Sequence, residues 1–572
     1  MILTGTGASP GIAIGNAYVL KKQEAALTGL ILTDDSAITF EIEKFDTAVN
    51  SSLTEINIMI DSYDEDNGSE GLEILETHIE LLSDPQIKED VAQKIAIEKR
   101  NVNDAVIAVI ADAVAMFKGM DNEYLQARAA DVQDIGNRIL KNLNITGKTA
   151  ARIYQRNTII IAEDLTPSDT ISMDITHVIG FATQAGSKTS HAAIIAKSRG
   201  IPAVVGCGDT LANIKNNDHL ILDGQTGEII INPDEETIIE YQVKKENWLA
   251  ETALLKSQKN KAAITTDGTL VQLFANIANA DDMEHAHSFG AEGSGLLRTE
   301  LLFMGRDSLP TEEEQFTFYK AVALKAKGKP VVVRTLDIGG DKQFPYFNFP
   351  AEQNPFLGYR AIRICLDRTD IFITQLKAIL RASAFGKLKI MFPMIANVQE
   401  IRAAKVILNQ AMEELDKAGI GFDKTIRIGI MIEIPSAAIT ADLLAKEVDF
   451  FSIGTNDLCQ YTLAVDRMNE KVKTLYDPYN PAVLRLISYV IDEANKNNIE
   501  VGMCGELASD PDATLLLLGM GLKEFSMSAT SIPHIKNTII QSDMEFAKQV
   551  KQRVMAMDNS IAIAAYLKEV NK

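Results

Sequence analysis

The sequence predicts a multidomain protein of the α/β plus all-α class: an α/β domain with an inserted helical bundle, followed by a (β/α)8 barrel of the TIM type. Three observations predict this fold. Strand-like segments alternate with helical patterns in the last 310 or so residues, helix-period apolar stripes fill residues 22–144, and glycine-rich strand patterns flank that helical block on both sides. A chain of 572 residues is also too long for one core and is expected to form about three to five domains.

The barrel is predicted from eight strand-like segments, namely TLVQLFANI, AEGSGLLRT, KPVVVRTLD, KLKIMFPMI, IRIGIMIEI, VDFFSIGTN, IEVGMCGEL and LKEFSMS. Helical patterns separate most of them, and eight βα units in about 300 residues match a (β/α)8 barrel. In such a barrel the strand ends meet at one face, where active sites are built. Polar residues stand at these ends: Asn276, Arg298, Arg334, Glu433, Asn456, Asp457 and Cys504. Arginines and carboxylates at one mouth indicate an anionic substrate held with a divalent metal.

The helical block is predicted because apolar residues recur every three or four positions. The stripes cover 38–60, 72–82, 102–117 and 125–139. Strand patterns precede the block at 2–20 and return at 158–162, 177–182, 202–205 and 219–222. We therefore expect residues 1–21 and 145–232 to form one α/β domain interrupted by the helical domain 22–144. Residues 233–261 are expected to form a linker helix, and residues 262–572 the barrel.

Composition narrows the functional classes. The chain has 78 acidic and 56 basic residues and a net charge of −22, which disfavours nucleic acid because neutralising phosphates requires clustered Lys and Arg. The four cysteines show no CxxC spacing, so neither a zinc site nor a disulfide framework is indicated. No signal-peptide pattern is visible and no apolar run approaches the roughly 18 residues of a membrane helix. We therefore expect a cytoplasmic protein without membrane insertion.

The segment GSKTSHAAIIAKSRGIPAVVG is the sharpest local motif. Thr189 or Ser190 can cap a helix that begins near Ala192, and Gly200 is placed to end it. His191 would then lie at the helix N-terminus, where the dipole disfavours an imidazolium and favours a bound anion. A neutral imidazole is nucleophilic, so this position suits a histidine that carries a phosphoryl group.

Such a phosphoryl group would meet the helix N–H groups and the side chains of Lys188, Thr189 and Ser190. Two other interpretations stand beside this one. A lone histidine at a helix start is more often purely structural. The letters GSKT also resemble the end of a nucleotide phosphate loop, but Ser187 separates Gly186 from Lys188 and breaks the required Gly-Lys pair.

Several motifs together resemble phosphoenolpyruvate-utilising enzymes. Besides the histidine turn they are ASPGIAIG, GSGLLRTELLFM, QNPFLGYRAIRI, MIEIPSA, SIGTNDLCQY and GMCGELASDP. In this order they resemble the Enzyme I family of the bacterial sugar phosphotransferase system across essentially the whole chain. The resemblance implies transfer of the phosphoryl group of phosphoenolpyruvate to His191 with release of pyruvate. The group would then pass to a histidine of a small phosphocarrier protein, the first step of sugar uptake.

The resemblance implies further roles at matching positions. Glu433 and Asp457 would ligate Mg²⁺, which takes one or two protein carboxylates and completes its octahedron with substrate and water; the alternative is solvated loop acids. Four residues match substrate-binding positions: Arg298, Arg334, Asn456 and Arg467. Arginine suits phosphate because its planar fork donates in pairs and stays charged at any working pH.

The remaining matches each keep a structural alternative. Cys504 would protonate the enolate carbon to release pyruvate, although a buried structural thiol is the usual fate of a cytosolic Cys. Arg360 would contact substrate or form a structural salt bridge. Thr170 would hydrogen-bond the histidine or act as an ordinary cap after Pro167. His78 would lie near the surface of the helical domain that docks the phosphocarrier protein, or at the edge of the core.

The resemblance also implies that the phosphohistidine α/β domain swivels to bring His191 to the barrel, and that the protein forms a homodimer through the barrel. One alternative is a pyruvate–phosphate dikinase or phosphoenolpyruvate synthase, which has a large nucleotide-binding domain ahead of the histidine. Here the 190 preceding residues show helical patterns and one strand segment. A second is a non-catalytic regulatory scaffold, but every matched catalytic position holds the expected residue type. A nitrogen-regulatory paralogue would have an extra N-terminal sensory domain, which we do not expect here.

Overall fold

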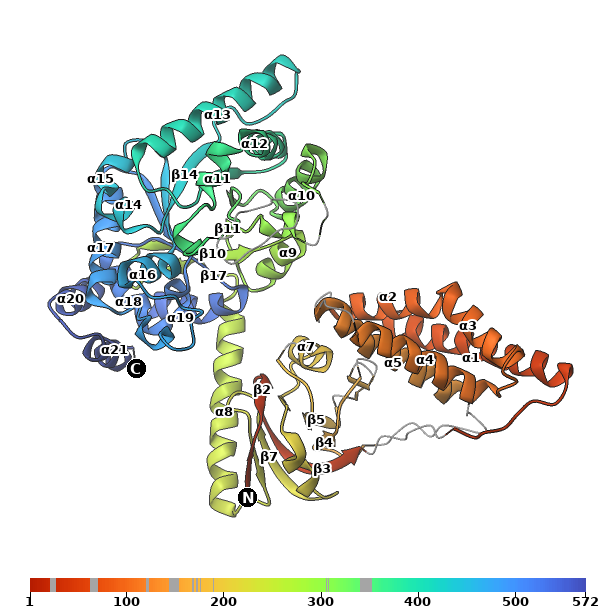
Figure 1. The fold of residues 1–572 in the computed structure, drawn as a ribbon. Helices are drawn as coiled ribbons and strands as arrows, with labels where there is room; N and C mark the ends of the chain where they lie inside the picture. The colour runs from red at the N-terminus through yellow and green to blue at the C-terminus, as the bar shows by residue number, and fades with distance from the viewer. Residues whose placement is uncertain are drawn as a thin grey trace. The chain divides into compact units, whose positions relative to one another are not determined.

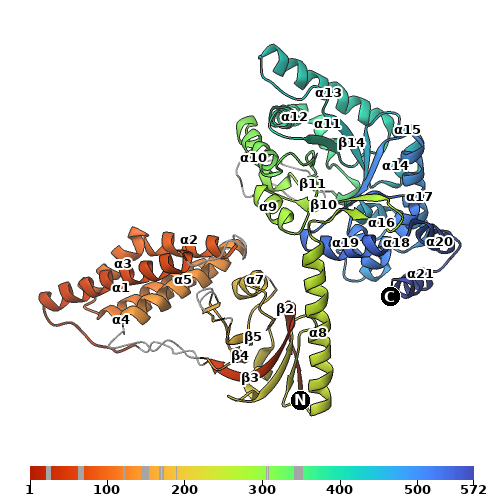
Figure 2. The same cartoon turned by 180° about the vertical axis from the view of Figure 1, so that it is seen from behind.

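The computed structural model divides the chain into two compact units, Met1–Thr252 and Ala253–Lys572 (Figure 1, with the reverse side in Figure 2). It describes residues 1–20, 27–61, 70–119, 123–143, 154–166, 169–170, 173–174, 176–188, 190–304, 306, 308–339 and 352–571. In these residues no helix combines the length and the apolar character that crossing a membrane requires.

The first unit contains an eight-stranded sheet whose strands come from both sides of the helical block, in the order β1-β8-β7-β3-β4-β5-β6-β2. The strands are β1 Ile2–Thr4, β2 Thr6–Ser9, β3 Ile12–Leu20, β4 Thr158–Ala162, β5 Val178–Thr183, β6 Ala203–Val205, β7 His219–Asp223 and β8 Glu228–Ile231. Strands β3 and β4 pair in parallel, from Asn16 opposite Thr158 to Leu20 opposite Ala162. The segments before and after the helices therefore share one sheet.

Strand β8 was not predicted, although its turn was visible in the sequence. It pairs antiparallel with β7 through the turn GQTG. Gly227 in this turn has φ +82°, a conformation that glycine adopts without strain.

The helical block consists of α1 Asp35–Asp61, α2 Glu70–Leu82, α3 Pro85–Ala96, α4 Val102–Lys118 and α5 Glu123–Leu143. The four predicted stripes fall within α1, α2, α4 and α5 and supply a shared core that includes Phe45, Ile56 and Ile135. Helix α3 was missed because it follows α2 after only a short turn. Its start is nevertheless well defined, since Asp84 caps it and Pro85 occupies the first turn.

Two more helices are described here: α7 His191–Ser198 follows β5, and α8 Glu235–Gln258 lies inside the predicted linker 233–261 and crosses the division after Thr252. The domain boundaries drawn from the sequence stay a prediction, because the compact division falls at one point, after Thr252.

The second unit is a closed barrel of eight parallel strands, as predicted. They are β10 Leu270–Ile277, β11 Ser294–Leu297, β12 Val331–Arg334, β13 Leu388–Phe392, β14 Arg427–Ile432, β15 Phe450–Ile453, β16 Glu500–Met503 and β17 Glu524–Met527. Each strand pairs with the next, and β10 pairs with both β17 and β11 to close the ring. The short strand β9 Ala263–Ile264 pairs antiparallel with β10.

Helices follow the strands. They are α9 Ala280–Ser288, α10 Glu312–Lys325, α11 Ile362–Asp367, α12 Thr369–Ser383, α13 Val398–Lys417, α14 Pro435–Ile439, α15 Ala441–Leu444, α16 Thr455–Leu463, α17 Pro481–Lys496, α18 Pro511–Met520, α19 Ile532–Gln541, α20 Met544–Met555 and α21 Ser560–Val570.

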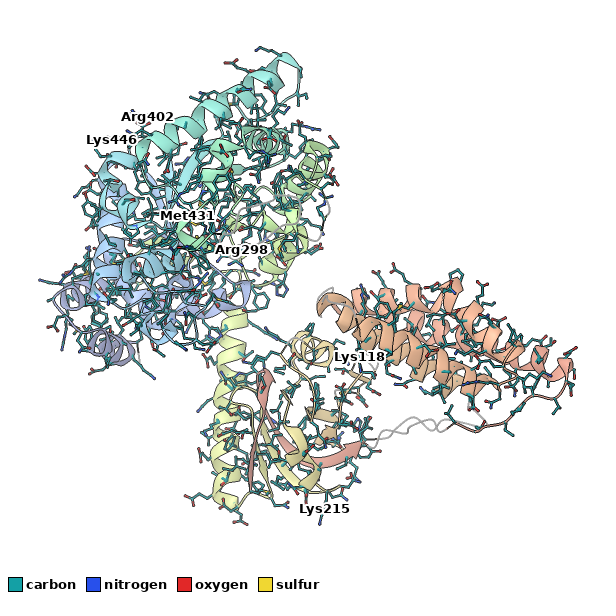
Figure 3. All side chains as sticks on the ribbon, in the orientation of Figure 1. Lys118, Lys215, Arg298, Arg402, Met431 and Lys446 are labelled. Atoms are coloured by element: carbon teal, nitrogen blue, oxygen red, sulfur yellow. The ribbon has the colours of Figure 1, made fainter. Side chains whose placement is uncertain are left out.

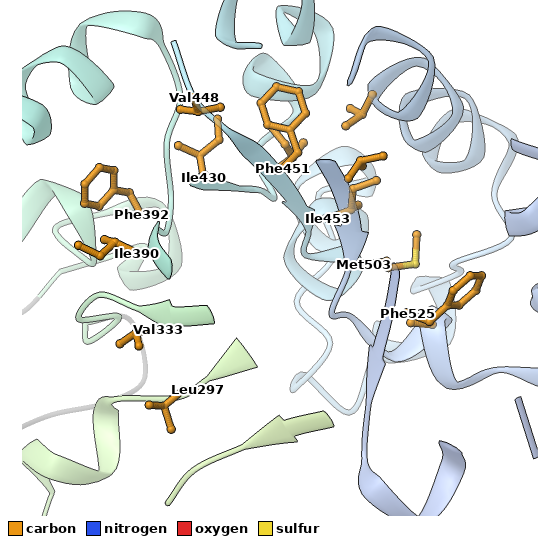
Figure 4. Packing of buried hydrophobic residues seen from close by; sticks show 14 of the residues in the cluster. Leu297, Val333, Ile390, Phe392, Ile430, Val448, Phe451, Ile453, Met503 and Phe525 are labelled. Carbon is orange, nitrogen blue, oxygen red and sulfur yellow. The ribbon is translucent and has the colours of Figure 1, made fainter. Parts of the chain in front are cut away.

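Alternation along the strands separates two apolar layers. Side chains such as Leu297, Val333 and Phe451 belong to the large core formed with the helices (Figure 4). Their neighbours along the strands contact one another in a separate small cluster that fills the barrel interior: Leu296, Val332, Met391, Met431, Phe450 and Cys504. The interior is therefore packed, and polar chemistry is left to the strand ends.

Candidate active site

A buried charged cluster lies where β12 ends. Arg334, the last residue of β12, pairs with Glu300 and with Asp337, the latter at 2.9 Å. Arg360 donates to the other oxygen of Asp337 at 3.0 Å and lies 3.4 Å from Asp457. Asp337 therefore bridges two guanidinium groups. Burial alone would lower the pKa of each arginine, but the neighbouring carboxylates raise it above its ordinary value, so both stay cationic.

Glu433 follows β14 directly and is 2% exposed. Its Oε1 accepts a hydrogen bond of 2.5 Å from the backbone N–H of Met394, a residue with φ +56° after β13. Burial, and then the carboxylates of Asp457 and Asp337, raise the pKa of Glu433 to about 8 against the opposing effect of the two buried arginines. A cation bound at the mouth would offset the negative charge of these carboxylates.

Cys504 follows β16 and is 6% exposed, with its thiol 3.9 Å from the carbonyl oxygen of Ile453. Burial raises the pKa of the thiol, a hydrogen bond with Ser452 and the charges of Arg334 and Arg298 oppose the shift, and the resulting pKa is about 11. The group therefore keeps its proton at neutral pH and can act as an acid. Arg298, which follows β11, contributes one of these charges.

The other predicted substrate residues are more open. Arg298 follows β11 and is exposed, and its side chain makes no hydrogen bond or ion pair within the described residues; Figure 3 labels it together with the interior residue Met431. The side chain of Arg467 is 37% exposed and reaches Asp457 only at 4.0 Å. Asn456 is fixed, because its amide exchanges two hydrogen bonds with Glu506, at 3.0 and 3.1 Å.

Two members of the charged cluster, Glu300 and Asp337, were not identified from the sequence as site residues. The signal was present, because Glu300 lies in LLRTE and Asp337 in VVVRTLD, each just after a predicted strand. What the pattern does not show is that both carboxylates turn toward Arg334.

The histidine turn has the predicted backbone with one difference. Helix α7 begins at His191, and Ser190 is its N-cap with extended backbone, but the Ser190 hydroxyl donates to the carbonyl of Ser187 at 2.9 Å. Ser190 therefore occupies the predicted N-cap position, but its side chain forms no cap hydrogen bond. Gly200, with φ +65°, follows the helix end as predicted. Lys188 is exposed. The side chain of His191 and the whole of Thr189 lie outside the described part.

Thr170 is fully buried in a turn near the C-terminal end of α7. Its hydroxyl donates to the carbonyl of Thr166 at 3.1 Å, and its own carbonyl accepts from the guanidinium of Arg199 at 2.8 Å. Arg199 directly follows α7, so this contact ties the turn to the helix that begins with His191.

His78 is fully buried within the helical block. Its ring nitrogens lie 3.4 Å from Asp131 and 3.8 Å from Asp134, both on α5. This position favours the core interpretation of His78 over direct contact with a partner.

Family models for phosphoenolpyruvate-utilising enzymes match three parts of the chain. The PEP-binding domain matches residues 252–544, the N-terminal domain residues 4–128, and the mobile domain residues 154–227.

Whole-length relatives carry one name. The phosphoenolpyruvate-protein phosphotransferase of Bacillus subtilis is 47% identical over 570 residues, covering 100% of both chains. That of Geobacillus stearothermophilus is 47% identical over 564 residues, covering 99% of this chain and 97% of its own. A solution structure of Enzyme I is 39% identical, covers 43% of this chain and 99% of its own, and has a TM-score of 0.36. The chain belongs to the phosphoenolpyruvate–protein phosphotransferase family.

Proposed function

We propose that this enzyme transfers the phosphoryl group of phosphoenolpyruvate to His191, with release of pyruvate, and then to a histidine of a small phosphocarrier protein. One observation carries the proposal. Cationic, carboxylate and thiol groups that are distant in sequence meet at one barrel mouth, around Arg334, Glu433 and Cys504. The whole-length relatives favour this function over a dikinase or synthase.

Phosphoryl transfer depends mainly on positioning and on stabilising charge. Arg298 and Arg467 are exposed enough to bind an incoming anion, whereas Arg334 and Arg360 are held by carboxylates. We therefore assign first capture of the substrate phosphate to Arg298 and Arg467. The buried arginine pair would lie in a fixed position beneath it, and the Asn456 amide would donate to a phosphate oxygen.

Glu433 and Asp457 are the residues that would hold Mg²⁺. The chemistry fits, since both are carboxylates, the charge of Asp457 raises the pKa of Glu433 as an uncompensated like charge does, and Mg²⁺ needs only one or two protein ligands. Groups of three or more His, Cys, Asp or Glu arranged for a metal are absent from the described residues. When bound, the ion would neutralise charge on the phosphate and the enolate oxygen.

Loss of the phosphoryl group leaves the enolate of pyruvate, whose carbon needs a proton. Cys504 supports this step because its raised pKa, about 11, keeps the thiol protonated at neutral pH. The site therefore holds a proton where the product must receive one.

The phosphoryl acceptor lies in the other unit. The reaction requires His191 to reach the barrel mouth, and we propose that the α/β domain swivels for this purpose. The phosphocarrier protein is proposed to dock on the helical block, because α2 of this block contacts α7, the helix that begins with His191. Cytoplasmic location and dimerisation through the barrel stay predictions.

The test is incubation with labelled phosphoenolpyruvate and Mg²⁺ of the wild type and of alanine variants at each of the seven histidines. Label should be acid-labile, base-stable and absent only from His191→Ala. Acid-stable label would contradict the nucleophile. Product formed from ATP and pyruvate without the phosphocarrier would instead indicate a dikinase or synthase, and a wild type that takes no label would favour the regulatory scaffold.

A further inference from the structure

A fully buried amide lies behind the two strand-end loops that carry Arg298 and Arg334. It belongs to Gln375 of α12, which is 0% exposed. Its Oε1 accepts a hydrogen bond of 2.9 Å from the backbone N–H of Leu336, two residues after Arg334. Its Nε2 donates at 3.3 Å to the hydroxyl of Thr299, the residue after Arg298.

The same network reaches the backbone of Arg334 directly. The Thr299 hydroxyl donates its hydrogen to the carbonyl oxygen of Arg334 at 3.0 Å, so it must accept the bond from Gln375. The second hydrogen of the amide goes to the hydroxyl of Tyr319 on α10, at 3.0 Å. Both amide hydrogens and the amide oxygen are therefore used.

This arrangement admits only one orientation of the amide. Rotating it by 180° would direct its NH₂ group at the N–H of Leu336 and leave Thr299 without a donor. Gln375 thus holds the loops after β11 and β12 in a fixed relation to one another, and does so from outside the barrel.

We propose that Gln375 is a positioning residue for phosphoenolpyruvate binding, acting through the loop backbone on Arg298 and Arg334. This inference rests on the proposed function of the barrel mouth. Because neither arginine side chain touches Gln375, its effect would come from placement: small displacements of charged groups that must align with a phosphate are costly.

The test compares three variants of the full-length enzyme. Gln375→Met keeps the length and unbranched shape of the side chain but removes all three hydrogen bonds. Thr299→Val removes the link to Arg334 while keeping the shape. The matched control is Gln315→Met: Gln315 is 1% exposed on α10, but its amide donates only to the carbonyl of Pro310, at 3.1 Å.

Steady-state transfer from phosphoenolpyruvate to the phosphocarrier and thermal unfolding are measured for each variant. We expect the KM for phosphoenolpyruvate to rise on the order of tenfold in Gln375→Met and Thr299→Val, with a smaller change in kcat. In Gln315→Met the KM should stay within about twofold even though the Tm falls, since leaving buried polar groups unpaired lowers stability in either glutamine variant.

An unchanged KM in Gln375→Met, or an equal rise in Gln315→Met, would overturn the positioning role. If Gln375→Met does not fold, Thr299→Val decides, and a wild-type KM there overturns the inference. A wild type that transfers no phosphoryl group would overturn the proposed function itself, so the two failures are distinguishable.

Discussion

Replacing Arg334 and Arg298 one at a time should distinguish an arginine that stabilises the fold as well as binding substrate from one that only binds substrate. Arg334 is 8% exposed and pairs with Glu300 and Asp337, which are 4% and 5% exposed. Removing one partner of a buried ion pair costs about 3–5 kcal/mol, because charge is left without compensation in a low dielectric. Arg298 is exposed without a protein partner in the described residues, and such surface changes usually stay within about 0.5 kcal/mol.

We therefore expect Arg334→Met to lower both stability and transfer rate, and Arg298→Met to lower the transfer rate alone. Loss of one positive charge from a phosphate site should slow transfer on the order of 100- to 1,000-fold in either variant. Calorimetric unfolding at neutral pH and single-turnover transfer from phosphoenolpyruvate measure the two effects. Equal destabilisation by both variants, or full stability of Arg334→Met, would refute the division. Arg402→Met is the control, since Arg402 is exposed on α13, outside the barrel, and pairs with a half-buried Glu447.

Four further predictions concern protons and metal. Cys504→Ala should slow pyruvate formation on the order of 100-fold with little change in the KM for phosphoenolpyruvate, as a lactate dehydrogenase-coupled assay would show. Asp457→Asn should raise the Mg²⁺ concentration for half-maximal transfer, and chelation should stop transfer in the wild type; activity that survives chelation would contradict the metal role. Burial raises the pKa of Glu524, at the start of β17, from 4.5 to about 7, so the stability it contributes is present below pH 4.5 and lost as the pH rises through 7. Glu524→Gln should thus raise the Tm at pH 8 but not at pH 4.5. For Glu500 the pKa shift has the opposite sign. Burial would raise its pKa, but neighbouring cations lower it, so the stability that Glu500 contributes is present above pH 4.5 and is lost in acid. Glu500→Gln should therefore lower the Tm at pH 8, and the same unfolding series checks both.

The barrel could be predicted from sequence because strand pattern and polar strand ends are local signals. A parallel closed barrel then places every carboxyl end on one face, so Arg334 and Cys504 are brought together by topology alone. Local competition between hydrogen bonds is harder to foresee. The Ser190 hydroxyl donates to the carbonyl of Ser187 and does not accept a hydrogen bond as a side-chain cap, and no residue pattern indicates which side-chain orientation is adopted.

Gln375 was beyond prediction for a different reason. In the sequence it is one polar residue in an ordinary amphipathic helix pattern, and its partners Thr299 and Leu336 are 76 and 39 residues away. Helical periodicity indicates only that such a residue faces inward. Which backbone groups its amide meets depends on the packing of α12 against two separate loops.

The arginines at the barrel mouth fall into two classes that the sequence motifs do not distinguish. Arg334 and Arg360 share the carboxylate Asp337, at 2.9 and 3.0 Å, and are fixed before substrate arrives. Arg298 has no such partner in the described residues, and Arg467 meets Asp457 only at 4.0 Å. A site whose arginines were all free would have to order every long side chain on binding, and one whose arginines were all paired would have to break ion pairs to bind. Combining a fixed pair with a free pair would avoid both costs, so in the proposed function the shared carboxylate of Asp337 would take part in phosphate recognition as much as the arginines it holds.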